Sequence, residues 1–162
     1  MMTISETVEW WINHKASDIK SNIRRDNLMA SGKSVNSIRT EINSTLSFVN
    51  AKILANESVK WLDDGRGPTH ATGPYKNTQT LRATIRKWLD EKGINPTDNI
   101  SKDSLAFLIA RKIHREGWRP KNRYPNGVIS SVINDKAIKE LIGSLGANVK
   151  IQVRNDIWQS FA

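Results

Sequence analysis

Cysteine is absent from this chain of 162 residues. Without thiols, the chain can form neither a disulfide nor a thiolate metal site. Long hydrophobic runs are absent too, because no stretch approaches the ~18 consecutive apolar residues that a membrane-spanning helix needs. The first residues, MMTISETVEWW, lack the basic region and following apolar stretch of a secretory signal. We therefore expect a soluble protein that is made in the cytoplasm and does not act at a membrane.

Two glycine-containing segments resemble nucleotide-binding loops, but neither has the spacing or the context that such a loop needs. In SGKS, residues 31–34, the earlier position that must be glycine is Asn27, and a helix rather than a strand is expected before it. In GRGPTHATG, residues 65–73, the third glycine comes too late for a dinucleotide-binding turn, and Pro68 follows the second. We therefore interpret both segments as structural turns.

Catalytic and metal-binding signatures are also missing. The histidines, His14, His70 and His114, are scattered and form no pair at a spacing of four residues. Asp63 and Asp64 are adjacent, so on a helix they point about 100° apart and do not converge on one site. Such a pair more often ends a helix and binds the amides of a turn or a nearby arginine. We expect a protein that is not an enzyme and holds no metal or cofactor, with an enzyme using Asp63, Asp64 and His70 as a third alternative.

The spacing of apolar residues predicts a series of helices. The first covers residues 1–31, with Ser5 as its N-cap and an end near Gly32. Its apolar stripe consists of Val8, Trp11, Ile12, Ile19 and Ile23. Further helices are expected at residues 57–63, at 79–92, from Ser101 or Asp103 to Gly117, and at 135–145. Stripes of Leu81, Ile85, Trp88 and Leu89, and of Leu105, Leu108, Ile109 and Ile113, place the two middle helices against the core.

Alternating apolar residues predict a small sheet. Residues 35–46 and 48–54 are expected to form a hairpin that turns near Asn43-Ser44, and residues 148–157 a C-terminal strand. Helices and strands are interspersed without regular βαβ spacing, which favours an α+β fold. We expect a single domain, residues 1–162, in which a small mixed or antiparallel sheet packs against the long N-terminal helix and two to three further helices.

Positive charge is concentrated in one segment of the chain. The net charge is +9, and residues 101–127 alone carry 7 basic and 2 acidic residues. A local basic patch indicates a polyanionic neighbour, either the phosphates of a nucleic acid or an acidic protein surface, although a solvated helix face explains it equally well. The cations are Arg111, Lys112, Arg115, Arg119, Lys121 and Arg123, with Trp118 and Tyr124 between them.

Tryptophan is frequent, with six residues against two tyrosines. Trp11 and Trp88 lie on the predicted core stripes, whereas Trp10, Trp118 and Trp158 lie in loops or near the termini. Aromatic residues outside the core are typical of protein interfaces. These three tryptophans therefore indicate an oligomeric surface.

The order of these features resembles a known family, the gene-product-ten-like minor virion proteins, which are tail-completion or neck proteins of tailed bacteriophages. After an N-terminal helix, the family has a glycine followed by a strand containing Ser-Ile, here SGKSVNSIRTEI at residues 31–42. A short aromatic-bearing helix then ends in an acidic residue, a spacer and glycine, here ESVKWLDDGRGPT at residues 57–69. Two further matching segments are LRATIRKWLDEKG and IARKIHREGWRPKNRYP, residues 81–93 and 109–125.

The resemblance implies a non-enzymatic structural subunit of the virion, made in the host cytoplasm. Such proteins form rings of about six or twelve copies between the portal and the tail, or complete the tail. Portal, adaptor or tail proteins would be neighbours, and the basic segment would line a DNA-filled channel or grip an acidic ring. A basic nucleic-acid-binding module is the alternative.

Two segments, residues 64–78 and 117–127, are then expected to be exposed interaction loops, with Arg66 as the first residue to mutate. The expected subunit-interface residues are Trp10, Trp61, Asp63, Asp64, Gly65, Arg66, Gly67, Pro68, Trp118, Tyr124 and Trp158. Contact with DNA or an acidic surface is expected at Arg111, Lys112, Arg115, Arg119, Lys121 and Arg123.

Overall fold

The computed structural model of the chain describes residues 2–45, 48–69, 76–97, 100–119 and 127–160, with the backbone alone at 76–79 and 151–160. The fold is α+β, as the sequence predicts. In chain order the elements are α1 (Ile4–Arg25), α2 (Lys33–Ser37), β1 (Arg39–Ser44), β2 (Val49–Leu54), α3 (Glu57–Asp64), α4 (Lys76–Glu91), α5 (Lys102–Glu116) and α6 (Asp135–Ser160). Within these ranges, no helix is both long and apolar enough to cross a membrane.

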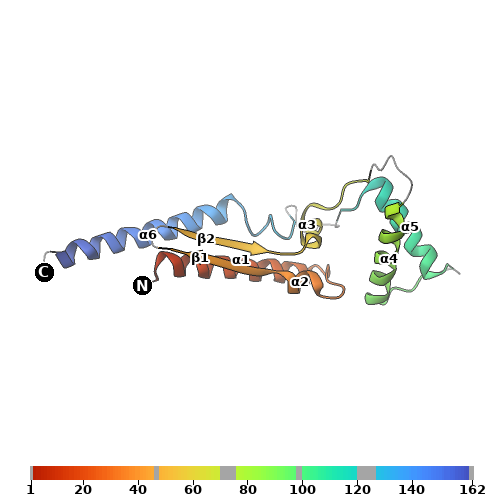
Figure 1. Cartoon of the computed structure of the whole chain (residues 1–162), viewed down its shortest axis with the longest axis horizontal. Coiled ribbons are helices and arrows are strands. Elements are labelled where there is room, and N and C mark those ends of the chain that lie inside the picture. The colour runs from red at the N-terminus through yellow and green to blue at the C-terminus, as the bar shows by residue number, and fades with distance from the viewer. Residues whose placement is uncertain (1, 46–47, 70–75, 98–99, 120–126, 161–162) are drawn as a thin grey trace.

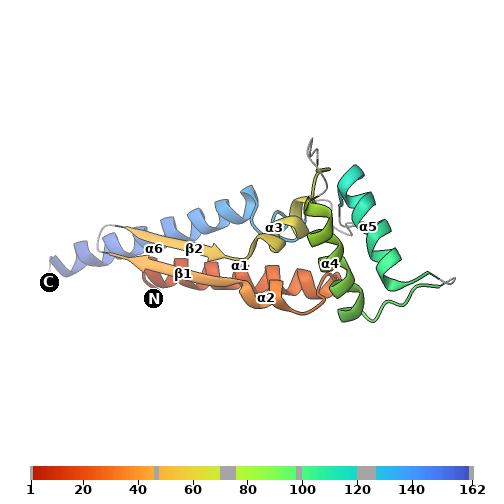
Figure 2. The same cartoon turned by 45° about the vertical axis from the view of Figure 1, so that its right-hand side comes forward.

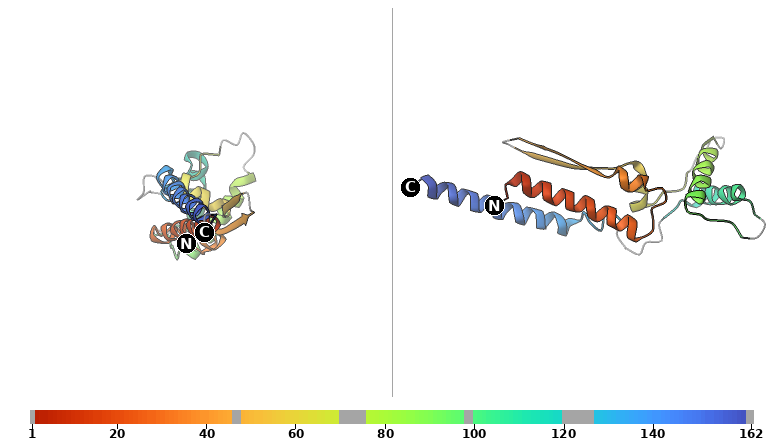
Figure 3. Two further views of the ribbon diagram at one scale, coloured as in Figure 1. Left: turned by 90° about the vertical axis from the view of Figure 1, so that its left-hand side faces the viewer. Right: turned by 90° about the horizontal axis from the view of Figure 1, so that it is seen from below.

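The molecule is elongated (Figure 1). One part, which we call the body, consists of α1, α2, the β-hairpin, α3 and α6. The other part, which we call the head, consists of α4 and α5 and lies at the far end from the chain termini (Figures 1 and 2). Within the body, α1 lies between the hairpin and α6 (Figure 3, right). The two ends of the molecule are thus built from different elements.

Helix α1 begins with a capping box and ends at a left-handed residue. The Thr3 side chain accepts a hydrogen bond from the Glu6 amide, while the Glu6 carboxylate accepts one from the Thr3 amide. The predicted N-cap at Ser5 is therefore wrong by two residues. The predicted end near residue 31 is also wrong, because the helix stops at Arg25 and Asn27 adopts a φ of 53°. Asparagine tolerates this conformation, which a continuing helix excludes.

The core of the body joins elements from both halves of the chain. Ile19 and Ile23 of α1, Val35 of α2 and Val59 of α3 pack with Val128, which lies 105 residues after Ile23. Burying an aliphatic side chain of this size contributes roughly 1.5–3 kcal/mol. The turn at residues 128–133 therefore packs with the same core as α1 and α3.

The β-hairpin is the only sheet in the described ranges, and its strands pair antiparallel from Arg39↔Leu54 to Ser44↔Val49. This register puts Thr40 opposite Ile53 on the half-buried face. The predicted turn at Asn43-Ser44 is wrong, because both residues are paired within β1 and the strands are joined by residues 45–48. A turn at 43–44 would shift the register and separate the inward-facing residues.

The predicted C-terminal strand at residues 148–157 is wrong, because α6 continues as a helix to Ser160. The helix runs antiparallel to α1. Asn148 Nδ2 donates to Thr7 Oγ1 at 2.7 Å near one end of the pair, and Asn22 Nδ2 donates to Ser131 Oγ at 3.1 Å near the other. Once this packing has formed the first half of α6, each further helical residue adds a hydrogen bond at little cost. That outweighs the local alternation of β-branched residues.

The middle helices do not cover the sheet, contrary to the prediction. Instead α4 and α5 pack chiefly against each other, away from the hairpin (Figure 1). Their small core contains Leu89, Ala106 and Ala110. Two residues assigned to the core stripes are on the surface, since Trp88 is 36% and Leu108 49% exposed. Of the two predicted N-caps, Ser101 and Asp103, the structure has Ser101, and the predicted end of α5 at Gly117 is confirmed.

Candidate functional site

The head is connected to the body by two chain segments, which run antiparallel and hydrogen-bond to each other at a point that we call the crossing. The outgoing segment leaves α3 at Gly65 and the returning one leaves α5 at Gly117. The next residues, Arg66 and Trp118, form an isolated antiparallel bridge in which each amide donates to the other's carbonyl at 2.6 Å. We call this pair the bridge. A third backbone bond, from Thr69 N to His114 O at 3.0 Å, continues the contact toward the head.

Both glycines at the crossing are required by conformation and by space. Gly65 has φ 79° and ψ −173°, and Gly117 has φ 77° and ψ −172°. This region is essentially restricted to glycine. A Cβ on Gly65 would lie 2.6 Å from Trp118 O, and one on Gly117 would lie 2.5 Å from Arg66 O. The two segments can approach this closely only because neither glycine has a side chain.

Arg66 is engaged within the chain. Its guanidinium lies 5.6 Å from the ring centroid of Trp61, and it donates to Thr69 Oγ1 at 3.3 Å. Of the predicted interaction loop at residues 64–78, Asp64, Gly67 and Pro68 are exposed, whereas Gly65 and Arg66 are half-buried. Residues 70–75 of that loop lie outside the described residues. The part next to α3 is therefore shaped by the bridge.

The Asp63 carboxylate, at the end of α3, binds the turn at residues 128–133. Its Oδ1 accepts hydrogen bonds from the Ile129 amide at 2.7 Å and the Ser130 amide at 3.1 Å, and its Oδ2 accepts one from the Ser130 hydroxyl. Gly127, at φ 74°, lies so close that a Cβ there would overlap the Asp63 carboxylate. Of the two partners predicted for an aspartate at this helix end, turn amides or a nearby arginine, Asp63 binds the turn amides.

Basic residues line the outer side of the head. Arg111, Lys112, Arg115 and Arg119 are all exposed. Arg115 pairs with Glu116 and lowers the pKa of that carboxyl, with a smaller contribution from Lys112. Arg111 and Arg119 have no carboxylate within 4 Å among the residues that the structure describes. The other predicted contact residues, Lys121, Arg123 and Tyr124, lie outside that set.

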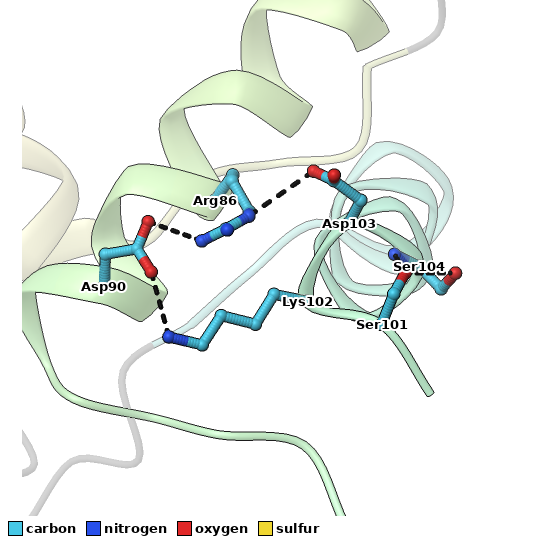
Figure 4. A network of polar contacts seen from close by, with 6 residues as sticks. All are labelled: Arg86, Asp90, Ser101, Lys102, Asp103 and Ser104. Carbon is cyan, nitrogen blue, oxygen red and sulfur yellow. Dashed lines mark hydrogen bonds and ion pairs between the residues drawn. The ribbon is translucent and has the colours of Figure 1, made fainter. Parts of the chain in front are cut away.

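A charged network joins the two helices of the head (Figure 4). Arg86 pairs with Asp90 on α4, and its Nε lies 3.4 Å from Asp103 Oδ1 on α5. Lys102 Nζ donates to Asp90 Oδ1 at 3.0 Å. The hydrogen bond from Arg86, followed by that from Lys102, lowers the pKa of Asp90. The network therefore stabilises the head while Asp90 is ionised.

The tryptophans proposed for the interface are exposed where the structure describes their side chains. Trp10 is 55% exposed and stacks on His14, with ring centroids 4.7 Å apart. Trp61 and Trp118 are also on the surface; Trp118 belongs to the bridge, and the ring of Trp61 lies against the guanidinium of Arg66. The backbone at Trp158 belongs to α6, but its side chain lies outside the described set. Exposure of Trp10 and Trp118 agrees with their predicted place outside the core.

No group of three or more metal-ligating side chains comes together in the part of the chain that the structure describes.

An open groove of about 520 Å³ lies between α1 and the start of α6, with Lys15, Arg25, Lys136 and Glu140 among its lining residues. Its buried amide, Asn22, donates to Val128 O and Ser131 Oγ and accepts from Arg25. The hydrogen bonds of Asn22 are thus made within the chain.

Comparisons with known proteins give no match. No model of a protein family matches the chain, and neither a curated protein nor a solved structure is detectably similar to it. The function is therefore inferred from the residues and the geometry of the chain itself.

The pairing of Arg66 with Trp118 was not predicted from the sequence, although the two segments share a sequence pattern. The patterns Asp64-Gly65-Arg66 and Glu116-Gly117-Trp118 both place an acidic helix end before a glycine and a long side chain. Phe107 was also not predicted as a surface residue, because it lies outside the predicted apolar stripe. Its side chain is 48% exposed.

Replacing Gly117 with alanine should lower the free energy of unfolding by at least about 1–3 kcal/mol, because alanine rarely adopts this conformation and its Cβ would meet Arg66 O. Gly67→Ala is the matched control, since a Cβ there meets nothing within 4 Å. Its effect should stay within roughly 0.5 kcal/mol. Urea unfolding of both variants measures the difference, and equal effects would contradict the role assigned to the crossing.

Asp90→Asn should lower the melting temperature at pH 7, because it removes the charge that pairs with Arg86 within α4 and with Lys102 of α5. The folded pKa of Asp90 is depressed, so its contribution is present above its ordinary pKa of about 3.9 and is lost as the pH falls through the folded pKa. The difference from wild type should therefore shrink toward pH 3. Glu91→Gln, an exposed neighbour, is the control, and a loss for Asp90→Asn that is independent of pH would argue against the network.

Proposed function

We propose that the chain is a structural virion subunit of a tailed bacteriophage, forming a ring at the junction of portal and tail or completing the tail. Its element order supports this proposal, because an N-terminal helix, a hairpin and a short helix ending at Asp64-Gly65 precede the two head helices. The same order underlies the resemblance to phage neck and tail-completion proteins. Neighbouring copies, together with portal, adaptor or tail proteins, would be its partners.

The observation that carries the proposal is the excess of surface. The chain exposes 11728 Å² to solvent. A globular monomer of 18.3 kDa is expected to expose about 8,100 Å². The excess, roughly 3,600 Å², is in the range that permanent subunit interfaces bury. A structural subunit would cover such surface on assembly.

Apolar side chains are exposed at both ends of the molecule. Ile4 and Trp10 are exposed on the N-terminal turns of α1, and Phe107 and Leu108 on the head. Ile142 of α6 is 61% exposed. Single apolar residues on a surface are ordinary, but neighbouring ones on several faces are typical of a protein with more than one partner contact. This distribution fits a subunit that touches neighbours on two sides.

The connection between head and body also suits a subunit of a ring. The head is attached through two segments that hydrogen-bond to each other, and Lys92 Nζ adds a contact to Asn27 O at 2.9 Å. Two attachments restrict the movement of the head more than a single linker does. A fixed orientation of head and body is what repeated contacts in a closed ring require.

A basic nucleic-acid-binding module is the second candidate. It is favoured by Arg111 and Arg119, which face solvent without a carboxylate nearby in the described residues. Phosphate contacts by such residues should weaken steeply with salt, by ~0.9 log unit per log unit of salt for each phosphate. A ring subunit that touches packaged DNA non-specifically would show the same behaviour, so DNA binding alone does not separate the two candidates.

Localisation of the chain in particles tests the proposed function. In the phage that encodes it, a tagged subunit should be found at the neck or tail by electron microscopy. Particles assembled without it should have filled heads that lack a stably joined tail. Infectious particles that contain no copies of the chain would contradict the proposal.

A further inference from the structure

The outer face of α5 combines apolar and basic side chains. Phe107, Leu108, Arg111, Lys112 and Arg115 share one side of the helix, at spacings of three and four residues, and all are exposed. The opposite side carries Ala106 and Ala110, which are buried against α4. We call these five residues the α5 outer face. Apart from the pairing of Arg115 with Glu116, no ion pair covers this surface among the residues that the structure describes.

This chemistry favours a protein partner over a nucleic acid. A duplex backbone would attract Arg111 and Lys112, but it offers nothing that covers Phe107 and Leu108. An interface with a protein uses both kinds of side chain, because apolar residues fill its centre and charged residues its rim. The complementary surface should therefore expose apolar side chains flanked by carboxylates.

The chain itself carries such a surface on the first turns of α1. Met2, Ile4 and Trp10 are exposed there, together with Glu6 and Glu9. No lysine or arginine precedes Lys15 in the sequence. We call these five residues the α1 tip. Within it Glu6, Glu9 and Trp10 share one side of the helix, at spacings of one, three and four residues. An exposed aromatic ring beside two carboxylates complements the apolar and basic side chains of the α5 outer face.

The other exposed apolar stripe in the described residues is a poorer complement. Ile138 and Ile142 of α6 are 43% and 61% exposed. Around them Asp135, Lys136, Lys139 and Glu140 are all exposed, so the two negative charges are balanced by two positive ones. This stripe therefore offers the cations of α5 no excess of negative charge.

The start of α1 lies on the side of the body that faces away from the head, so the α1 tip and the α5 outer face cannot meet within one copy (Figures 1 and 3). We propose that the α5 outer face of one copy binds the α1 tip of a second copy, head to tail. A contact between two different patches repeats from copy to copy and closes into a ring if the rotation permits. This inference rests on the proposed ring function and assigns the surfaces that form the ring.

Charge exchange tests the contact. Glu9→Arg and Arg111→Glu should each weaken self-association of the full chain about tenfold, because each opposes like charges across the interface. The double variant should recover to within about threefold of wild type, since the pair is restored with its signs exchanged. Lys87→Glu is the matched control, an exposed cation on α4, and should have no effect. Sedimentation velocity over a range of protein and salt concentrations gives the association constants.

Disulfide trapping tests the contact where association is weak, and the absence of native cysteine makes it clean. Asn13→Cys lies beside the α1 tip and Ser104→Cys beside the α5 outer face, both at exposed positions. Mixed at up to about 1 mM and oxidised, the two single variants should form the mixed disulfide in excess of either symmetric one. A statistical mixture overturns the proposal, as does a double charge variant that shows no recovery.

Duplex DNA added to the same variants separates the remaining outcomes. If Arg111→Glu abolishes DNA binding while charge exchange restores no self-association, the face binds nucleic acid and the proposal is wrong. If the chain localises to the neck but the charge variants assemble normally, the surface assignment fails and the proposed function stands. If the exchange restores association but the chain is absent from particles, the proposed function fails instead.

Discussion

The position of the head depends on the crossing of two backbone segments, Gly65-Arg66 and Gly117-Trp118. Each amide of the bridge is satisfied by the carbonyl opposite, at 2.6 Å, and each glycine makes room for the other segment. A side chain at either glycine would push the segments apart and leave the bridge amides to water. The 51 residues between the two glycines include both helices of the head, so the crossing joins the two ends of this segment where it meets the body.

Asp63 extends this constraint into the body. Its carboxylate receives the amides of Ile129 and Ser130 just before the crossing begins, while Val128 packs in the core with α1 and α3. The end of α3, from which the chain enters the head, is thus hydrogen-bonded to the turn that leads into α6. This attachment fixes the distance between the α5 outer face and the α1 tip. A contact that repeats from copy to copy requires such a fixed distance.

The sequence predicted those features that depend on neighbouring residues. The apolar stripe of α1, the cap at Ser101, the stop at Gly117 and the aspartate that binds turn amides all follow from local patterns. The errors arose where distant packing decided. Residues 148–157 alternate like a strand, yet α6 forms because its first half packs on α1, and no local signal fixes the hairpin register or the pairing of Arg66 with Trp118. Such contacts join residues that are far apart in the sequence. The periodicity of apolar residues does not show which distant segments come together.

Amide hydrogen exchange at Arg66 and Trp118 measures the crossing most directly. Both amides donate within the bridge, although their residues lie outside regular helices and strands. If the crossing fixes the head to the body, these amides should exchange about as slowly as that of Ile23 in the core of α1. Exchange as fast as in an unstructured peptide would show that the segments separate freely, and would contradict the account.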